Sequence, residues 1–371
     1  MSGKVIKVFP GGNTAEGFYS FYPYLLEKGE QRVFILKGGP GVGKSTLMRR
    51  VGQKMLTCGY NVEFHHCSSD SNSLDGIAVP EVGVVIVDGT TPHIIDPKYP
   101  GVVDEIVNLG EFWDEVKLKQ NWEKIKASTD EVSRHFARAY SFLKAARSVA
   151  ENISDLYRRS MDFAKVNKLT AQFLDLLKST YSQEKVGRER HLFSCAYTPE
   201  GFVDFSASIV QQADKIYYLK GEMGTGKSTL LEKVASQAIA KGLDTEIYHT
   251  PLIPRKIGTV LIKDLGLAIT TSAELEDKKE LLTGQFDLNR YLDRKMTLTF
   301  QDTIESDNLI LTELIEKGLS CIREAKAEHD ILEQYYIPNL DFAAVREKGE
   351  EIISAIFRLV GGETAATAFY H

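Results

Sequence analysis

Two nonapeptides in this 371-residue sequence have the composition and spacing of a phosphate-binding loop. The first is Gly38-Gly39-Pro40-Gly41-Val42-Gly43-Lys44-Ser45-Thr46, and the second is Gly221-Glu222-Met223-Gly224-Thr225-Gly226-Lys227-Ser228-Thr229. Each follows an apolar run and precedes a helix-like run, which is the context that the P-loop motif G-x-x-x-x-G-K-[ST] requires. Glycines allow successive backbone N–H groups to point at phosphate oxygens, and the following helix directs its positive end toward the anion. We therefore predict a nucleotide-binding loop at each of these two places.

The lysine and serine that end each motif indicate which groups a nucleotide would contact. Lys44 has the length and charge to reach the β- and γ-phosphates, and Ser45 offers a hydroxyl oxygen to Mg²⁺. Ser228 offers the same oxygen in the second motif. Residues 167–170 resemble the guanine-reading motif N-K-x-D, but Thr170 stands where the aspartate is needed. We therefore expect ATP as the nucleotide and Mg²⁺ as its metal ion.

An aspartate after an apolar run is the main candidate for catalysis. Residues 84–88 read Val-Val-Ile-Val-Asp, the Walker B pattern of a buried strand that ends in an acid. We predict that Asp88 supports Mg²⁺, directly or through water, and that it acts with Lys44 in catalysis. Asp75, expected in a loop beside the phosphates, is our choice for positioning the attacking water. Asp70 in the same loop is an alternative, unless its side chain only stabilises a turn.

The segment at residues 91–100 leaves the end of the Walker B strand and is rich in proline. Two of its side chains, His93 and Lys98, have the chemistry to close over a bound phosphate. The alternative interpretation is that this segment is only a connection between elements, made rigid by its prolines.

Sequence similarity between the two halves extends well beyond the motifs. Segments match at offsets of 183 or 184 positions in the first part of each half and of 179 positions in the last part. The clearest matches are residues 14–18 with 198–202, 44–46 with 227–229, and 162–166 with 341–345. We predict that the threonines Thr14 and Thr198 cap a helix that follows each of them. The pattern indicates a gene-duplicated domain, with units at residues 1–185 and 186–371.

Strands that alternate with helices in each duplicated unit predict an α/β fold. We expect duplicated P-loop NTPase domains with parallel, doubly wound sheets whose ligands bind at the carboxyl ends of the strands. We also expect each domain to carry a long helical hairpin extension, at about residues 113–181 in the first unit and 276–356 in the second.

The two helical tracts share a pattern but differ in charge. A heptad-like seam in the first tract predicts a helix with one buried face. The seam consists of Ala139, Phe142, Ala146, Val149, Ile153 and Leu156. Residues 113–177 carry a net charge of +3, and the equivalent residues 292–356 carry −7. We interpret this difference as a sign that the tracts meet each other, with separate partners or plain solvation as the alternatives.

The second unit lacks the acidic residues that the first unit offers for catalysis. Where the first unit has Asp70, Asp75 and Asp88, the second has Ile253, Gly258 and Thr271. Its glycine-rich motif is intact, so we predict a unit that binds nucleotide but is poorly equipped to hydrolyse it.

Composition narrows the class of protein. Hydrophobic residues make up 43% and charged residues 26% of the chain, as in ordinary soluble proteins. A net charge of −6 argues against a non-specific nucleic-acid binder. The sequence shows no signal peptide and no apolar run long enough for a membrane span. The four cysteines lack the spacing of a zinc site, so we expect reduced thiols in the cytoplasm.

The tandem arrangement resembles a bacterial family of uncharacterised ATPases with two P-loop NTPase domains. Four segments carry the resemblance: residues 37–46, 87–93, 96–101 and 190–193. The resemblance extends over the whole chain and implies nucleotide binding and a P-loop fold, but no particular substrate. The second unit departs from the pattern most between Pro251 and Glu274, which argues against catalysis there.

These observations favour a Mg²⁺-dependent ATPase that hydrolyses mainly in its first unit and whose second unit binds nucleotide in a regulatory role. A small-molecule phosphotransferase is one alternative, with Asp70 or Asp75 accepting a hydroxyl proton. That alternative calls for an Arg-rich lid, and Arg188 with Arg190 make only a small cluster. A nucleotide-dependent binding protein with little turnover is the other alternative. Besides nucleotide, we expect a protein partner or a second copy at the helical tracts, no membrane and no nucleic acid.

Overall fold

The computed structural model describes residues 2–25, 29, 31–91, 93–177 and 184–361. The chain forms two compact units. Unit 1 comprises residues 1–10, 22–136 and 323–371, and unit 2 comprises residues 11–21 and 137–322. Pro92 of the proline-rich loop and residues 178–181 of the first helical tract lie outside the described residues.

Unit 1 is built on a six-stranded mixed sheet with the strand order β1-β5-β6-β7-β4-β8. In chain order the strands are β1 (Val5–Val8), β4 (Arg32–Lys37), β5 (Val62–His66), β6 (Leu74–Val79), β7 (Val84–Asp88) and β8 (Asp104–Asn108). The apolar runs of β4 and β7 pair in parallel at its centre, with Leu36 opposite Asp88. That register brings the end of β7 next to the first glycine-rich loop.

Unit 2 contains a second six-stranded mixed sheet, with the order β16-β12-β15-β14-β13-β9. Its strands are β9 (Glu189–Phe193), β12 (Lys215–Lys220), β13 (Thr245–His249), β14 (Ile257–Ile262), β15 (Leu267–Thr270) and β16 (Gly284–Asp287). If the strands of each sheet are numbered in chain order, both sheets have the same spatial order, 1-3-4-5-2-6. Both sheets are therefore α/β sheets of one topology.

One strand in each sheet runs against the others, so the prediction of purely parallel sheets is wrong. In unit 1, β6 is antiparallel to both β5 and β7, and in unit 2, β14 is antiparallel to β13 and β15. The reason is the length of the connections. Residues 80–83 join β6 to β7 in a tight turn, whereas a parallel pair needs a crossover of a dozen residues or more.

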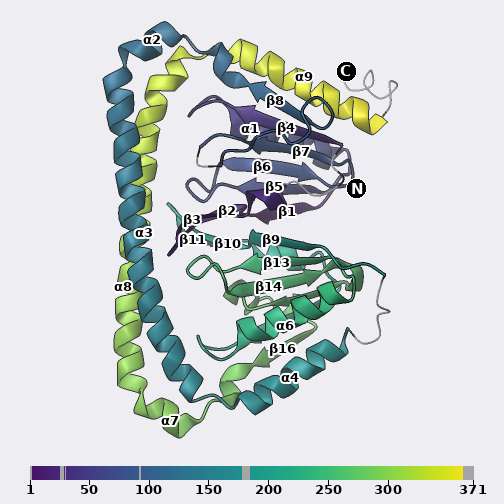
Figure 1. The fold of residues 1–371 in the computed structure, drawn as a ribbon, viewed down its shortest axis with the longest axis vertical. Coiled ribbons are helices and arrows are strands. Elements are labelled where there is room, and N and C mark those ends of the chain that lie inside the picture. The colour runs from purple at the N-terminus through teal and green to yellow at the C-terminus, as the bar shows by residue number, and fades with distance from the viewer. Residues whose placement is uncertain (1, 26–28, 30, 92, 178–183, 362–371) are drawn as a thin grey trace. The chain divides into compact units, whose positions relative to one another are not determined.

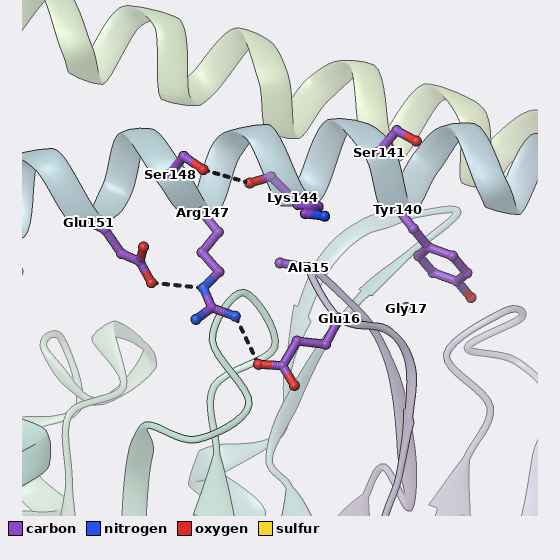
Figure 2. A pocket seen from close by; sticks show the side chains of 9 residues that line it. All are labelled: Ala15, Glu16, Gly17, Tyr140, Ser141, Lys144, Arg147, Ser148 and Glu151. Carbon is purple, nitrogen blue, oxygen red and sulfur yellow. Dashed lines mark hydrogen bonds and ion pairs between the residues drawn. The ribbon is translucent and has the colours of Figure 1, made fainter.

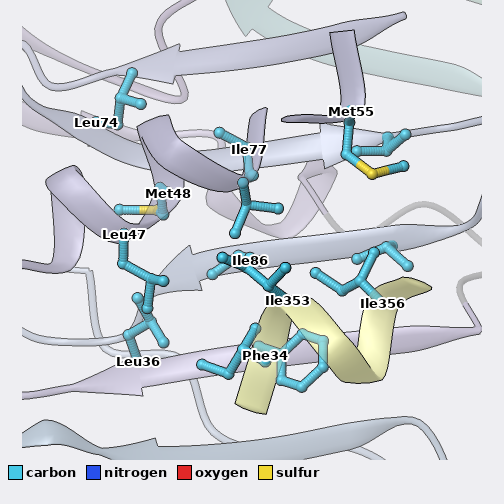
Figure 3. Packing of buried hydrophobic residues seen from close by; sticks show 14 of the residues in the cluster. Phe34, Leu36, Leu47, Met48, Met55, Leu74, Ile77, Ile86, Ile353 and Ile356 are labelled. Atoms are coloured by element: carbon cyan, nitrogen blue, oxygen red, sulfur yellow. The ribbon is translucent and has the colours of Figure 1, made fainter. Parts of the chain in front are cut away.

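Two helices pack on the sheet of unit 1 (Figure 3). Helix α1 (Lys44–Thr57) follows the first glycine-rich loop and buries Met48 and Met55. Helix α9 (Phe342–Gly361) comes from the end of the chain and adds Ile353 and Ile356 to the same core. Unit 2 has the corresponding pair, α6 (Lys227–Ala240) and α4 (Phe163–Asp175).

The compact units are divided differently from the duplicated sequence units at 1–185 and 186–371. Helix α4 is the last helix of the first tract but buries Val166, Leu169 and Phe173 in the core of unit 2, and α9 is the last helix of the second tract but packs in unit 1. The chain passes from unit 1 to unit 2 within α3 (Trp122–Arg159) and returns within α8 (Gln301–Tyr336). Each tract thus exchanges its last helix with the other half.

The expected helical hairpins are not formed. After the short helices α2 (Glu115–Gln120) and α7 (Arg294–Thr299), each tract continues as one long helix, α3 with 38 residues and α8 with 36, before its last helix (Figure 1). A helix of this length spans roughly 55 Å, which allows it to begin in one unit and end in the other.

The two tracts contact each other within unit 2, as expected. Ala146, Ala150 and Ile153 of α3 form an apolar cluster with Ile304 and Leu311 of α8. Apolar side chains therefore make this contact within unit 2, and an ion pair between His135 and Glu324, at 2.9 Å, joins the same two helices within unit 1. Among the residues that the structure describes, no helix is long and apolar enough to cross a membrane.

The helix predicted after Thr14 is absent, because residues 11–20 form a hairpin. Strands β2 (Gly11–Thr14) and β3 (Gly17–Ser20) pair antiparallel. The Thr14 hydroxyl accepts from the Glu16 N–H at 3.0 Å and donates to the Gly17 carbonyl at 2.7 Å, so it stabilises a turn. Gly17 has φ of 92°, a left-handed conformation that reverses the chain. Strands β10 (Cys195–Thr198) and β11 (Gly201–Asp204) form the same hairpin after Thr198.

Candidate functional site: two glycine-rich loops

The first glycine-rich loop, residues 38–46, joins β4 to α1. Gly41 and Gly43 have φ of 68° and 87°, a backbone conformation that side chains other than glycine rarely adopt. Gly43 precedes the first helical residue and offers no side-chain cap, so the first N–H groups of α1 are directed into the loop. This local geometry is compatible with the anion site that we predict from the sequence.

Lys44 lies at the centre of the first loop. Its Nζ donates to the carbonyls of Gly38 at 2.6 Å and Gly39 at 3.0 Å. The same nitrogen is 3.4 Å from Oδ2 of Asp88, and both side chains are largely buried. The structure thus brings Lys44 and Asp88 together, as the Walker B pattern indicates.

The carboxylate of Asp88 is fixed by the turn that follows it. Oδ1 accepts from the Thr90 N–H at 2.9 Å and from the Thr90 hydroxyl at 2.5 Å, while Oδ2 faces Lys44. Ser45 adjoins this arrangement, and its Oγ accepts from the N–H of Leu74 at 3.0 Å. The oxygens of Ser45 and Asp88 are hard donors of the kind that Mg²⁺ prefers, so this donor set fits the ion.

Asp75 lies in strand β6 rather than in a loop, and only 5% of its surface is exposed. The Tyr22 hydroxyl donates to its Oδ2 at 2.5 Å, and His93 Nε2 is 3.7 Å from the same oxygen. The rings of Tyr22 and His93 stack with their centroids 4.2 Å apart. Burial raises the pKa of Asp75 above its usual value. Sequence patterns do not point to Tyr22, because it is distant from Asp75 in the chain and no motif contains it.

Asp70 lies in the loop between β5 and β6, where its side chain stabilises a turn. Its Oδ1 accepts from the Asn72 N–H at 3.1 Å, and its Oδ2 accepts from the Ser73 hydroxyl at 3.0 Å. The interpretation as a turn residue is confirmed. The same carboxylate is 3.6 Å from Nζ of Lys326, a residue of α8 that the sequence did not single out.

Residues from the far end of the chain cover the first loop. A Cβ added at Gly41 would lie 2.6 Å from Ile337 Cγ1, and one added at Gly39 would lie 2.8 Å from Trp113 Cη2. The Trp113 ring also packs near Tyr336, with centroids 5.3 Å apart. Glycine is therefore required in this loop for packing as well as for backbone conformation.

The second loop, residues 221–229, joins β12 to α6 with the same geometry. Lys227 Nζ donates to the carbonyls of Gly221 and Glu222, and Ser228 Oγ accepts from the Ile257 N–H at 2.8 Å. Burial lowers the pKa of Lys227 to about 8. Thr271 stands where the first unit has Asp88, so the second loop has the lysine and serine without that carboxylate.

Helices α3 and α4 cover the second loop. A Cβ added at Gly224 would lie 2.1 Å from the carbonyl oxygen of Ser154 in α3, and one added at Gly226 would lie 3.3 Å from Val166 in α4. The Glu222 N–H donates to Oδ1 of Asn289 at 2.9 Å, which ties the start of the loop to the residues after β16.

A cavity of about 610 Å³ lies elsewhere in unit 2, between α3 and the turn of the β2–β3 hairpin (Figure 2). Its lining residues are Ala15, Glu16, Gly17, Tyr140, Ser141, Lys144, Arg147, Ser148 and Glu151. Arg147 crosses it and forms ion pairs with Glu16 and Glu151, each at 2.8 Å. The sequence did not predict this cavity, because the hairpin turn was expected to be a helix.

Comparisons with known proteins give no further assignment: no family model, no curated protein and no solved structure matches this chain.

Proposed function

We propose that this chain is an ATP-binding P-loop protein whose two glycine-rich loops each bind Mg·ATP and whose first loop hydrolyses it. The observation that supports this most is the approach of Lys44, at the start of α1, to Asp88, at the end of β7, with Ser45 next to Lys44 in the chain. We also propose that the two sheets derive from one duplicated P-loop NTPase domain, as the tandem family resemblance implies. The matching strand orders agree with that origin.

In this proposal the first loop holds the phosphates through its backbone N–H groups and Lys44. The Lys44 ammonium exchanges the carbonyls of Gly38 and Gly39 for β- and γ-phosphate oxygens, which bind it more strongly because they are charged. Ser45 and Asp88 would hold Mg²⁺, which neutralises phosphate charge when it is bound. The second loop can make the lysine and serine contacts but lacks the carboxylate at Thr271.

We assign Asp75 a positioning role, because its burial separates it from a position beside the attacking water. Asp75 holds the Tyr22 hydroxyl and lies beside His93. The backbone N–H of His93 in turn donates to the backbone carbonyl of Thr90 at 2.8 Å. This network fixes the turn whose residue Thr90 orients Asp88.

Titration calorimetry with Mg·ATP tests the proposal, and we expect two binding sites per chain. Lys44→Ala and Lys227→Ala should each remove one site, because each deletes the cation that faces the phosphates. Lys54→Ala, at the other end of α1 and half-exposed, is the matched control and should leave both sites. A nucleotide-free protein that binds fewer than two equivalents, or a Lys44→Ala protein that binds two, would contradict the proposal.

Nucleotide affinity at the second loop should decrease as the pH rises. Lys227 has a lowered pKa of about 8, so it is mostly protonated at pH 7 and mostly neutral at pH 9. Since only the protonated form attracts phosphate, we expect roughly tenfold weaker ATP binding at pH 9 than at pH 7, measured in Lys44→Ala. ATP affinity at the first loop, measured in Lys227→Ala over the same pH range, is the control for ionisation of the nucleotide itself. Equal pH dependence at both loops would show that Lys227 does not titrate there.

A further inference from the structure

The last part of α8 runs across the first loop within unit 1. Near its end, Glu333 Cβ lies 3.8 Å from the position of a Cβ at Gly41, and Ile337 lies closer still. Three turns earlier, Nζ of Lys326 is 3.6 Å from Oδ2 of Asp70. Residues 326–336 span about 15 Å of helix between these two contacts. The helix therefore extends from the glycine-rich loop to the loop after β5.

The side chains on this part of α8 recur at helical spacing. Lys326, His329, Glu333 and Ile337 are separated by three or four residues, so they follow one side of the helix. His329 Nδ1 is 3.9 Å from Oε1 of Glu333. Because Ile337 and Lys326 both contact the nucleotide-binding side of unit 1, the charged residues between them face the same side.

A terminal phosphate bound at the first loop would lie on the side of Lys44 and Ser45. In this motif the N–H groups of the loop hold the inner phosphates, Lys44 reaches the β- and γ-phosphates, and Ser45 marks the side on which the metal lies. Ser45 Oγ accepts from the N–H of Leu74, at the end of the loop that contains Asp70. A γ-phosphate beside Ser45 therefore lies near the Asp70 loop and near the cation paired with it.

We propose that Lys326 of α8 contacts the γ-phosphate of ATP at the first loop, as a cation supplied by the other half of the sequence. This inference rests on the proposed function. Asp70 and Asp330 both pair with Lys326, so the side chain has alternative anionic partners close at hand. Moving from Asp70 to the γ-phosphate exchanges one anion for a more highly charged one.

Lys326 is suited to this role because it remains charged. Burial lowers the pKa of its ammonium, but the hydrogen bond to Asp330 and the charge of Asp70 outweigh this effect, so the pKa is raised. In hydrolysis the water oxygen forms a bond to the γ-phosphorus, the bond to the β–γ bridging oxygen breaks, and ADP leaves with that electron pair. A water proton goes to solvent. Lys326 exchanges no proton and stabilises charge on the γ-phosphate oxygens.

The second loop offers an informative contrast. At the offset of 179 positions, Lys326 corresponds to Arg147 of α3. Arg147 pairs with both Glu16 and Glu151 at 2.8 Å, in the cavity shown in Figure 2. Lys326 also has two carboxylate partners, but one of them, Asp70, lies 3.6 Å away.

The test measures ATP and ADP affinity and ATP turnover in the Lys227→Ala background, where only the first loop binds. Lys326→Gln should weaken ATP binding by roughly tenfold and leave ADP binding unchanged, because ADP has no γ-phosphate. Turnover should fall by a similar factor, and Lys326→Arg should restore much of it. Lys317→Gln is the matched control, because Lys317 forms the same kind of i,i+4 ion pair elsewhere on α8 and should change nothing.

Each outcome of this test is decisive. If Lys326→Gln weakens the binding of ATP and of ADP equally, or weakens neither, the inference about Lys326 is wrong. The proposed function, ATP binding and hydrolysis at the first loop, is not affected by that result. If the parent protein binds ATP without turnover, the hydrolysis part of the proposed function is wrong. The effect of Lys326→Gln on the ratio of ATP to ADP affinity still decides the role of Lys326. If the parent protein binds no nucleotide, both proposals fail together.

Discussion

Asp88→Asn is expected to lower ATP turnover on the order of a hundredfold, about 2.7 kcal/mol of barrier. The substitution keeps an oxygen that can accept from Thr90, but it removes the negative charge that lies 3.4 Å from Lys44. That charge orients the lysine and is the carboxylate in the donor set that fits Mg²⁺. Steady-state hydrolysis measures the loss, and calorimetry should show that ATP still binds.

Asp96→Asn is the matched control for this prediction. Asp96 lies eight residues after Asp88, but its side chain is 82% exposed. Its carboxylate comes no closer than 3.9 Å to Nζ of Lys37, so the pair is weak. The same chemical change there should leave turnover unaltered. Lys227→Ala should also keep most of the activity, because the second loop lacks the carboxylate. A Lys227→Ala protein as inactive as Lys44→Ala would instead show that the second loop is catalytic or tightly coupled to the first.

The sequence predicted the parts of the candidate site that are local in the chain. A glycine-rich loop between a strand and a helix is determined by residues that follow one another, so Lys44 and Ser45 could be placed correctly. Asp88 could be placed as well, because an apolar run beside the loop strand brings its last residue to the same edge of the sheet.

Asp75 and Thr14 show where sequence reasoning failed. Both lie next to turn-forming residues, and the surroundings of Asp75 alone suggest a loop. What decides its place is the antiparallel strand β6, together with burial against Tyr22, a residue with no motif of its own. Thr14 was expected to cap a helix, but Gly17 closes the chain into a hairpin.

The exchange of the last helices lay beyond any local pattern. The apolar faces of α4 and α9 indicate that each helix packs on a sheet, but they do not say on which one. The choice follows from the length of α3 and α8, which pass from one compact unit to the other before the last helix begins. Ile337 thereby reaches the first loop, and Lys326 reaches the loop that contains Asp70, from the second half of the sequence.

The second large effect is expected at Gly224, where α3 contacts the second loop. Gly224 has φ of 85°, and an added Cβ would lie 2.1 Å from the carbonyl oxygen of Ser154. Because that neighbour is backbone, neither partner can move aside by a change of rotamer. Gly224→Ala therefore combines left-handed strain, about 1–3 kcal/mol, with displacement of a helix. ATP binding at the second loop should be lost, while the first loop should still bind.

Gly201→Ala separates the two contributions, because Gly201 has φ of 112° but nothing within 4 Å of an added Cβ. It should show the backbone strain alone. Since the chain has two units and need not unfold in one step, amide hydrogen exchange is the suitable measurement. Exchange near Ser154 should accelerate in Gly224→Ala and stay at the parent rate in Gly201→Ala. Equal exchange there in both variants would mean that α3 does not press on the second loop, and that this loop is not tied to the long helix that begins in unit 1.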